Sequence, residues 1–239
     1  MPTNVLNWTK WFNKSPFRPF INKIEELDVE KVRDTDRWFL VTAGFHTSQL
    51  GDLTMMYRLI GQISRRLNRD FITILNEDHT PKKEPEDVYF NSLFHVNVDF
   101  TSLIVFLGIL VEKAARLSHS ITVGNRPWKL SFRDWKDKIV KGSLIAPEDF
   151  KELFINTRWY ETLDMLRNEY TIHHNISIGG VVNKTKFQFI SNLDERQKIY
   201  DIKEMENLSD DILTYFKDYN DFLCNNFDLL PIQIDTIKL

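Results

Sequence analysis

Apolar residues recur every three or four positions over most of the chain, which is the spacing of one face of an α-helix. In the first such stretch they are Leu53, Met56, Tyr57, Ile60, Ile63 and Leu67. Three residues with N-cap side chains, at 34–36, precede this stretch, so the first long helix is expected over about 36–75. The charged, proline-containing segment that follows, 76–87, is expected to form an exposed loop.

A second long helix is expected over about 88–120, and its centre is apolar on all sides. The longest apolar run, from Leu103 to Val111, has nine residues and ends at Glu112 and Lys113. Because about 20 apolar residues are needed to cross a bilayer, we expect a helix buried in a bundle, and no membrane partner.

Three further helices complete the pattern. One is expected over 131–140, between an N-cap serine and a glycine stop. Another begins with Pro147 in its first turn and runs to about residue 174, with a break near Asn156. The last one covers 209–225, with its first residue, a serine, as the N-cap.

Two segments depart from helical spacing. In 181–204, Phe187 and Phe189 alternate with polar residues, which predicts a β-hairpin. Residues 1–30 contain three prolines and several aromatic residues, and are expected to form an irregular arm packed over the body or over a partner subunit. We therefore predict an all-α fold, a bundle of four to five helices with a small β-hairpin insertion, as one domain over 31–239.

Composition narrows the functional classes. The chain has 239 residues, 42% hydrophobic and 27% charged, which is typical of a globular protein. Its net charge of −3 excludes a protein that coats polyanions, so only a local nucleic-acid site is compatible with it. The single cysteine, Cys224, forms no internal disulfide, and no run of signal-peptide length occurs at the start, so a reducing, cytoplasmic location is expected.

The familiar phosphate-loop, dinucleotide, hydrolase and metal-binding motifs are absent from the sequence. One segment, 166–180 (LRNEYTIHHNISIGG), stands out because it combines Arg167 and Asn168 with His173 and His174. On a regular helix His174 lies about 20° from the direction of Arg167, and His173 about 120° from it. Either histidine could approach the arginine if the helix loosens at its end.

An arginine beside a histidine suits phosphodiester chemistry. The arginine holds a phosphate in a bidentate grip and never loses its charge, while the histidine transfers a proton near neutral pH. The alternative is a plain helix C-terminus, where histidines satisfy the last carbonyl groups and complement the helix dipole.

The segment resembles the motif of the HEPN family of helical-bundle domains, an arginine with a following polar residue and a histidine after four to six residues. Here these are Arg167, Asn168 and His173 or His174. The resemblance covers about eight residues closely and 37–225 loosely. It implies a homodimer with two Arg/His sets in one cleft, as in metal-independent ribonucleases of toxin–antitoxin, CRISPR-linked and phage-defence systems. Other members are inactive and serve as binding modules.

The same resemblance implies a mechanism and the partners. A histidine deprotonates a 2′-hydroxyl of single-stranded RNA, Arg167 of each subunit stabilises the charged phosphorane, and Asn168 orients the arginine or contacts phosphate. No cofactor or metal takes part, and an antitoxin or regulatory protein is a further expected partner. The tyrosine that some members carry two positions after the histidine is replaced by Asn175 or Ile176, so regulation by tyrosine adenylylation is not expected.

A basic stripe lies on the first long helix. Arg58, Arg65 and Arg69 are spaced seven and four residues apart, and Arg66 adds to the cluster. The stripe could guide an RNA backbone toward a cleft, or it is a solvated helix face.

Two further groups of residues are candidates for a functional site. His46, His119, Glu169 and His173 could form a metal site in a bundle enzyme, although no repeated Glu-x-x-His pair is present. The N-terminal aromatic residues could stack RNA bases or pack on the body; they are Trp8, Trp11 and Phe12. The sequence therefore predicts a HEPN-like ribonuclease, with an inactive RNA- or protein-binding module as the alternative.

Overall fold

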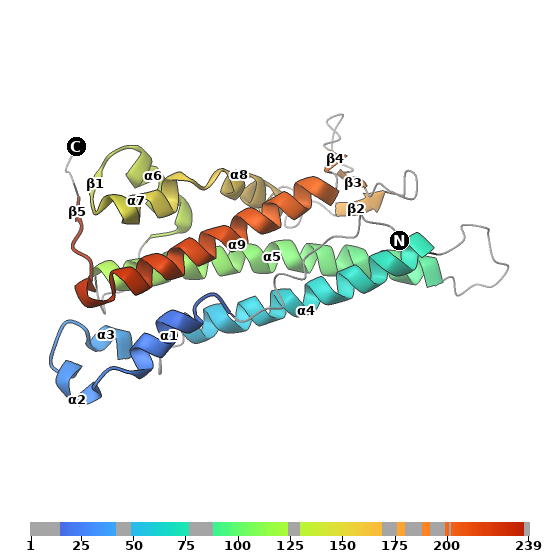
Figure 1. Ribbon diagram of the computed structural model, residues 1–239. Coiled ribbons are helices and arrows are strands. Elements are labelled where there is room, and N and C mark those ends of the chain that lie inside the picture. The colour runs from blue at the N-terminus through green and yellow to red at the C-terminus, as the bar shows by residue number, and fades with distance from the viewer. Residues whose placement is uncertain are drawn as a thin grey trace. The chain divides into compact units, whose positions relative to one another are not determined.

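The computed structural model describes residues 15–41, 49–76, 88–123, 130–168, 176–179, 188–191, 199–200 and 202–236, and these are predominantly helical (Figure 1). The helices are α1 (Arg18–Glu25), α2 (Val29–Val32), α3 (Trp38–Val41), α4 (Gln49–Asn76), α5 (Val88–Val123), α6 (Phe132–Val140), α7 (Glu148–Ile155), α8 (Arg158–Met165) and α9 (Ile202–Asn225). The strands are β1 (Leu144–Ile145), β2 (Ile176–Gly179), β3 (Gln188–Ser191), β4 (Ile199–Tyr200) and β5 (Asp235–Thr236), and a 3-10 turn covers Phe227–Leu229. The predicted all-α helical bundle is confirmed.

Two compact units divide the described chain. Unit 1 draws on residues 58–108 and 159–211, and unit 2 on residues 14–57, 109–158 and 212–239. Each unit contains fully buried apolar side chains, such as Leu103 and Leu107 in unit 1 and Phe150 and Phe154 in unit 2.

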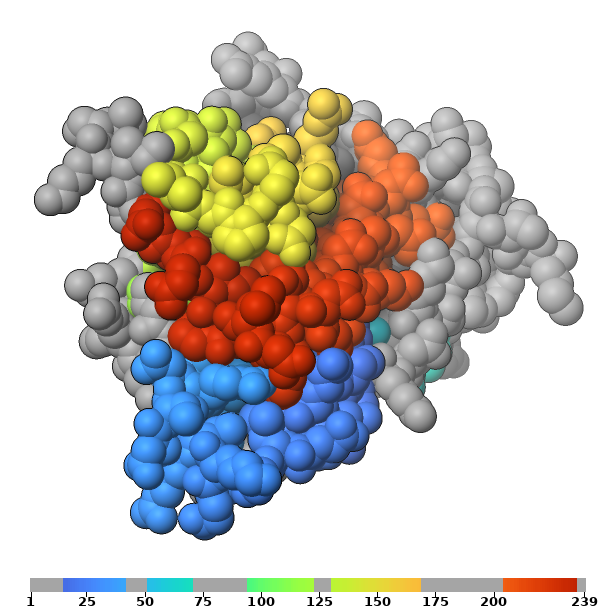
Figure 2. Space-filling view, turned by 60° about the vertical axis from the view of Figure 1, so that its left-hand side comes forward, coloured from blue at the N-terminus to red at the C-terminus, as the bar shows by residue number. Residues whose placement is uncertain are grey.

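Aromatic rings fill the core of unit 2. Trp135 of α6 stacks on Phe154 of α7, with ring centroids 5.7 Å apart, and meets Phe150 edge-on at 5.5 Å. Edge-on ring contacts also join Phe132 of α6 to Tyr215 of α9. Figure 2 shows α9 and the C-terminal tail between the segment of α1–α3 and the segment of α6 and α7. Such ring pairs add to the free energy of apolar burial.

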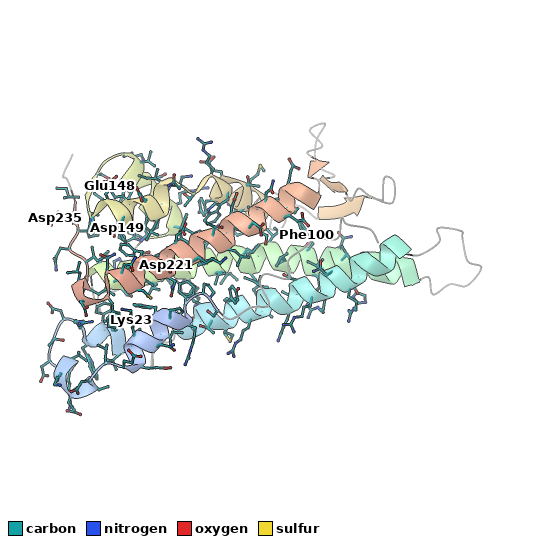
Figure 3. The ribbon with its side chains drawn as sticks, in the orientation of Figure 1. Lys23, Phe100, Glu148, Asp149, Asp221 and Asp235 are labelled. Atoms are coloured by element: carbon teal, nitrogen blue, oxygen red, sulfur yellow. The ribbon has the colours of Figure 1, made fainter. Side chains whose placement is uncertain are left out.

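The N-terminal arm is helical in the part that the structure describes, which corrects the prediction of an irregular segment over 1–30. Helices α1 and α2 lie there, and Phe17 and Phe20 are fully buried. Phe17 contacts the ring of Phe216 edge-on at 5.6 Å, so the arm packs on the body of unit 2, as expected. Lys23 of α1 lies 5.5 Å from the ring centre of Phe227. The side chain of Lys23 is labelled in Figure 3.

Helix α6 begins and ends as its sequence predicts. The Ser131 hydroxyl accepts a hydrogen bond from the Asp134 backbone N–H at 3.1 Å, and the Asp134 carboxylate accepts one from the Ser131 backbone N–H at 2.9 Å. This reciprocal pair is a capping box. The helix stops before Gly142, whose positive φ of 67° suits a residue without a side chain. Strand β1 follows and pairs antiparallel with β5.

Other boundaries are partly confirmed. Helix α5 and the break near Asn156, between α7 and α8, agree with the prediction. The helix predicted to start at about residue 36 is described in two parts: the short α3, whose Trp38 N–H donates to the Thr35 carbonyl, and α4 from Gln49, while residues 42–48 lie outside the described part. The predicted cap Ser209 is wrong, since it lies buried inside α9, whose first residue is Ile202.

The predicted β-hairpin is confirmed, but it begins earlier than residue 181. Strands β2 and β3 pair antiparallel from Ile176 with Ser191 to Gly179 with Gln188, and β4 pairs with β3. The early start has a local cause, because Ile176 and Ile178 already alternate with a serine, which is strand spacing.

Helix α5 contains one stretch, Phe94–Thr122, that is long and apolar enough to cross a membrane by length and composition alone. Half of its most apolar window is buried inside the protein, as in the core helix of a soluble protein. Among the core side chains of α5, Leu103, Leu107 and Leu110 are fully buried. These side chains of α5 belong to the apolar core of the described residues.

Candidate functional site

Arg167 and Asn168 lie directly after α8, in a π-helical turn formed by residues 166–168. The turn is anchored by Leu163 and Leu166, which are buried. Turns of this type widen the helix locally and occur frequently at functional sites. The local sequence thus places two polar side chains at a helix end that is fixed by apolar packing.

A ring of three hydrogen bonds joins Arg167 and Asn168 to Asp164 of α8. Arg167 donates from Nη2 to Asp164 Oδ1 at 3.2 Å and from Nε to Asn168 Oδ1 at 3.2 Å. Asn168 donates from Nδ2 to the same Asp164 oxygen at 2.9 Å. Only 8% of Asp164 is exposed, whereas a quarter (25%) of the Arg167 side chain is exposed. The guanidinium is therefore held from the protein side, in a side chain that is partly exposed.

Gly108 of α5 forms the surface on which the Arg167 side chain lies, and both residues belong to unit 1. A Cβ atom built on Gly108 would lie 2.7 Å from Arg167 Cδ and 3.3 Å from Nη1. A methyl group in that place would overlap the middle of the arginine chain. The close packing of these two residues requires a glycine at this position.

This arrangement can bind an anion. A guanidinium stays charged at all relevant pH values and presents its N–H groups in one plane, which matches the geometry of phosphate oxygens. The carboxylate of Asp164 offsets part of the positive charge but also holds the group in a fixed orientation.

The predicted histidines, His173 and His174, lie outside the described residues, so the choice between them stays a prediction. Of the residues that could hold a metal ion, His46, Glu169 and His173 also lie outside them, and His119 is buried in α5. Within the described ranges, no group of three or more His, Cys, Asp or Glu side chains is arranged to bind a metal ion. Trp8, Trp11 and Phe12 likewise fall outside the part that the structure describes.

The arginine stripe is exposed on α4, as predicted. Arg58, Arg65 and Arg69 all have exposed side chains, and over residues 51–70 every exposed charged residue of the helix is an arginine. The carboxylates nearby are buried: Asp99 of α5 accepts two bonds from Arg66 at 2.7 and 2.9 Å. The hydrogen bonds with Asp99, and then the negative charges of Asp99 and Asp70, raise the pKa of the Arg66 guanidinium. The outer face of this helix is therefore positive.

The structure brings Arg167 and Asn168 together, and it places the stripe on a different helix of the same unit. Sequence reasoning missed Asp164 and Gly108. Asp164 had a readable signal, since residues three and four positions later lie on the same face of a helix. Gly108 interrupts an apolar helix, which marks a special position, but nothing local identifies the arginine 59 residues later as its neighbour.

Comparison of the chain with protein-family models, with curated proteins and with solved structures finds no match in any of the three.

Proposed function

We propose that this protein is a metal-independent endoribonuclease of HEPN type, which cleaves single-stranded RNA as a cytoplasmic homodimer. The observation that carries the proposal is Arg167, whose partly exposed side chain packs on Gly108 and whose guanidinium is held by Asp164 and Asn168. Preorganised positive charge of this kind is what a phosphoryl-transfer site needs. Arg167 lies six residues before His173 and seven before His174, the two candidate histidines.

The proposed reaction is a transesterification within the RNA. His173 or His174 takes the proton of a 2′-hydroxyl, and the O2′ atom attacks the adjacent phosphorus. Arg167 of each subunit stabilises the extra negative charge of the phosphorane. The bond from phosphorus to the O5′ atom breaks, the O5′ atom receives a proton, and the products carry a 2′,3′-cyclic phosphate and a 5′-hydroxyl group.

The exposed arginines of α4 are proposed to hold the RNA backbone. Arg58, Arg65 and Arg69 occupy one face of the helix, and their spacing covers about 16 Å at a rise of 1.5 Å per residue. Binding through several arginines releases counterions, so the affinity for RNA should fall as salt is raised. Such a local patch is compatible with the net charge of −3.

One observation favours the alternative, an inactive helical module that binds RNA or a protein partner such as an antitoxin. Asp164 compensates the charge of Arg167, and an arginine paired in this way also serves to hold a helix end in place. The two functions differ in whether Arg167 is needed for cleavage, and that difference is testable.

Purified protein incubated with mixed single-stranded RNA in EDTA should release fragments that end in 2′,3′-cyclic phosphate. Arg167→Ala should lower the cleavage rate by about 10²–10³-fold or more, because a charged donor to the transition state is lost. Arg37→Ala is the matched control: its arginine is similarly buried (26% exposed), pairs with Asp228 and lies in unit 2. Full cleavage by Arg167→Ala, or none by the wild type, contradicts the proposal, and dependence on a metal revives the metal-site alternative.

The same assay identifies the base. Replacing the working histidine should remove the limb of the pH–rate profile near pH 6–7 and cost about 10²-fold, while replacing its neighbour should cost much less. We expect His173 to be the base, because the spacing implied by the resemblance favours it. Equal, small losses from both substitutions would exclude a catalytic base at either position.

The proposed composite site requires two subunits. Sedimentation at micromolar concentration should therefore show a species of about twice the chain mass of 28.4 kDa. Mixing an Arg167→Ala chain with a chain lacking the working histidine tests whether one cleft holds residues of both subunits. A purely monomeric protein that still cleaves RNA would contradict the composite site but not the ribonuclease activity.

A further inference from the structure

We infer that Asp164 and Gly108 are positioning residues that set the orientation of the Arg167 guanidinium, Asp164 by hydrogen bonding and Gly108 by close packing. The inference deepens the proposed function and rests on it for its catalytic consequence. The geometric part stands on the contacts alone.

Asp164 is placed to hold both of its partners at once. Arg167 and Asn168 follow it by three and four residues, and their donors converge on one oxygen, Oδ1. The carboxylate is 8% exposed, so its solvation by water is largely replaced by these two donors. Because both donors converge on one buried oxygen, Asp164 orders the side chains of Arg167 and Asn168 together.

Asn168 closes the arrangement and fixes its own amide orientation. Its oxygen accepts from Arg167 Nε and its nitrogen donates to Asp164, so exchanging the two amide atoms would break both bonds. The guanidinium is thus held at two nitrogens, Nε and Nη2. A planar group held at two points cannot rotate about its own chain, and its plane is set by the protein.

Gly108 fixes the path of the arginine chain before it reaches those bonds. The 2.7 Å approach involves Cδ, an atom in the middle of the chain, so an added methyl group would displace everything beyond it. In an ordinary helix interior, replacing glycine by alanine favours the helix. Here the same change should move the guanidinium from its partners while leaving α5 helical.

The direct test is the nuclear magnetic resonance signal of the Arg167 Nε–Hε group, identified by its disappearance in Arg167→Lys. In the wild type we expect a separate signal that exchanges slowly with solvent, since this proton is bonded to Asn168. Asp164→Asn and Gly108→Ala should each shift this signal and raise its exchange rate by about tenfold or more. Asp52→Asn is the control, since it removes a carboxylate that pairs with Lys113 in unit 2.

The second readout is the cleavage of RNA by the same variants. Misorienting a charged donor weakens transition-state binding more than substrate binding, so kcat should fall about tenfold or more while KM changes little. Circular dichroism and thermal unfolding establish that each variant is folded at the assay temperature. An Asp164→Asn variant that keeps the wild-type kcat, or that loses no more than Asp52→Asn, overturns the catalytic part of the inference.

Failure of this inference can be told apart from failure of the proposed function. If the wild type cleaves RNA through Arg167 but the Nε–Hε signal is unchanged in both variants, the positioning roles are wrong and the ribonuclease stands. If the signal responds as expected but the wild type has no activity, Asp164 and Gly108 do position Arg167, and the ribonuclease proposal is wrong. An unchanged signal together with an inactive wild type overturns both.

Discussion

The start of α6 and the end of α8 both depend on an aspartate that accepts several hydrogen bonds. At the start of α6, Asp134 binds the backbone and the hydroxyl of Ser131, and it lies at the surface. At the end of α8, Asp164 binds the side chains of Arg167 and Asn168, and it is buried. The first aspartate completes a backbone cap, whereas the second organises a cation.

An aspartate has two different roles at these two helix ends, as a cap at Asp134 and as a partner of an arginine at Asp164. A capping aspartate is satisfied by groups that every helix start leaves unpaired, so it needs nothing from the rest of the fold. The hydrogen bond from Arg167 to Asp164 forms where Gly108, on another helix, leaves room for the arginine chain. Dependence on a distant residue therefore distinguishes a candidate functional site from local helix chemistry.

The largest effect on stability is expected in the aromatic core next to α6, and not at either aspartate. Trp135→Ala should lower the free energy of unfolding by about 3–5 kcal/mol, because a fully buried indole in contact with two phenylalanine rings is lost. Urea unfolding measures this, with Val140→Ala as control, since Val140 is an exposed residue of the same helix. A loss similar to that of the control would show that α6 depends on its cap and not on its packing.

The two aspartates should differ in the next experiment. Asp164→Ala should cost about 1–3 kcal/mol, because it removes the buried oxygen that accepts one hydrogen bond from Arg167 and one from Asn168. Asp134→Ala should cost about 0.5–1 kcal/mol, the range of a surface helix cap. Urea unfolding at pH 7 compares the two directly. A larger loss of stability in Asp134→Ala than in Asp164→Ala would mean that Arg167 and Asn168 hydrogen-bond to solvent or to other partners at little cost. The three hydrogen bonds at the end of α8 would then contribute little to stability.

The smallest effect is a pH dependence at the start of α6. Hydrogen bonds from the backbone and the hydroxyl of Ser131 lower the pKa of Asp134 below its ordinary value. A lowered pKa means that the stabilisation is complete above the ordinary value, about pH 4, and is lost as pH falls through the folded-state value. The stability difference between wild type and Asp134→Asn should therefore shrink between pH 6 and pH 3, as measured by unfolding at each pH. A difference that stays constant would show that the charge of Asp134 adds nothing to the cap.

Much of the fold could be read from the sequence where local signals are strong. The start and stop of α6 follow from Ser131 and Gly142, and the length of α5 follows from a continuous apolar pattern. Where the prediction was wrong, tertiary contacts override the local signal: Ser209 has a capping side chain but lies inside α9. The helices of the N-terminal arm were missed because they have only eight and four residues, too few for a clear helical spacing of apolar positions.

The sequence predicted two of the four residues of the candidate site, Arg167 and Asn168. Arg167 and Asn168 stand together in the chain and could be named as a pair, and the structure joins them. Asp164 belongs to the same helix face and could have been included on spacing alone. Gly108 could not, because its role exists only through contact with a residue far along the chain, and such contacts leave no trace in local periodicity.

The glycine at position 108 constrains how this fold can change over time. Substitutions that favour helix formation are common and usually tolerated. Here a larger residue at position 108 would occupy the space in which the Arg167 side chain lies. A descendant with a larger residue at position 108 must already have lost Arg167, or the same substitution displaces the Arg167 side chain. Positions 108 and 167 are therefore expected to vary together. A chain with glycine and arginine at these positions would retain the candidate site, and a chain with neither would retain only the helical fold.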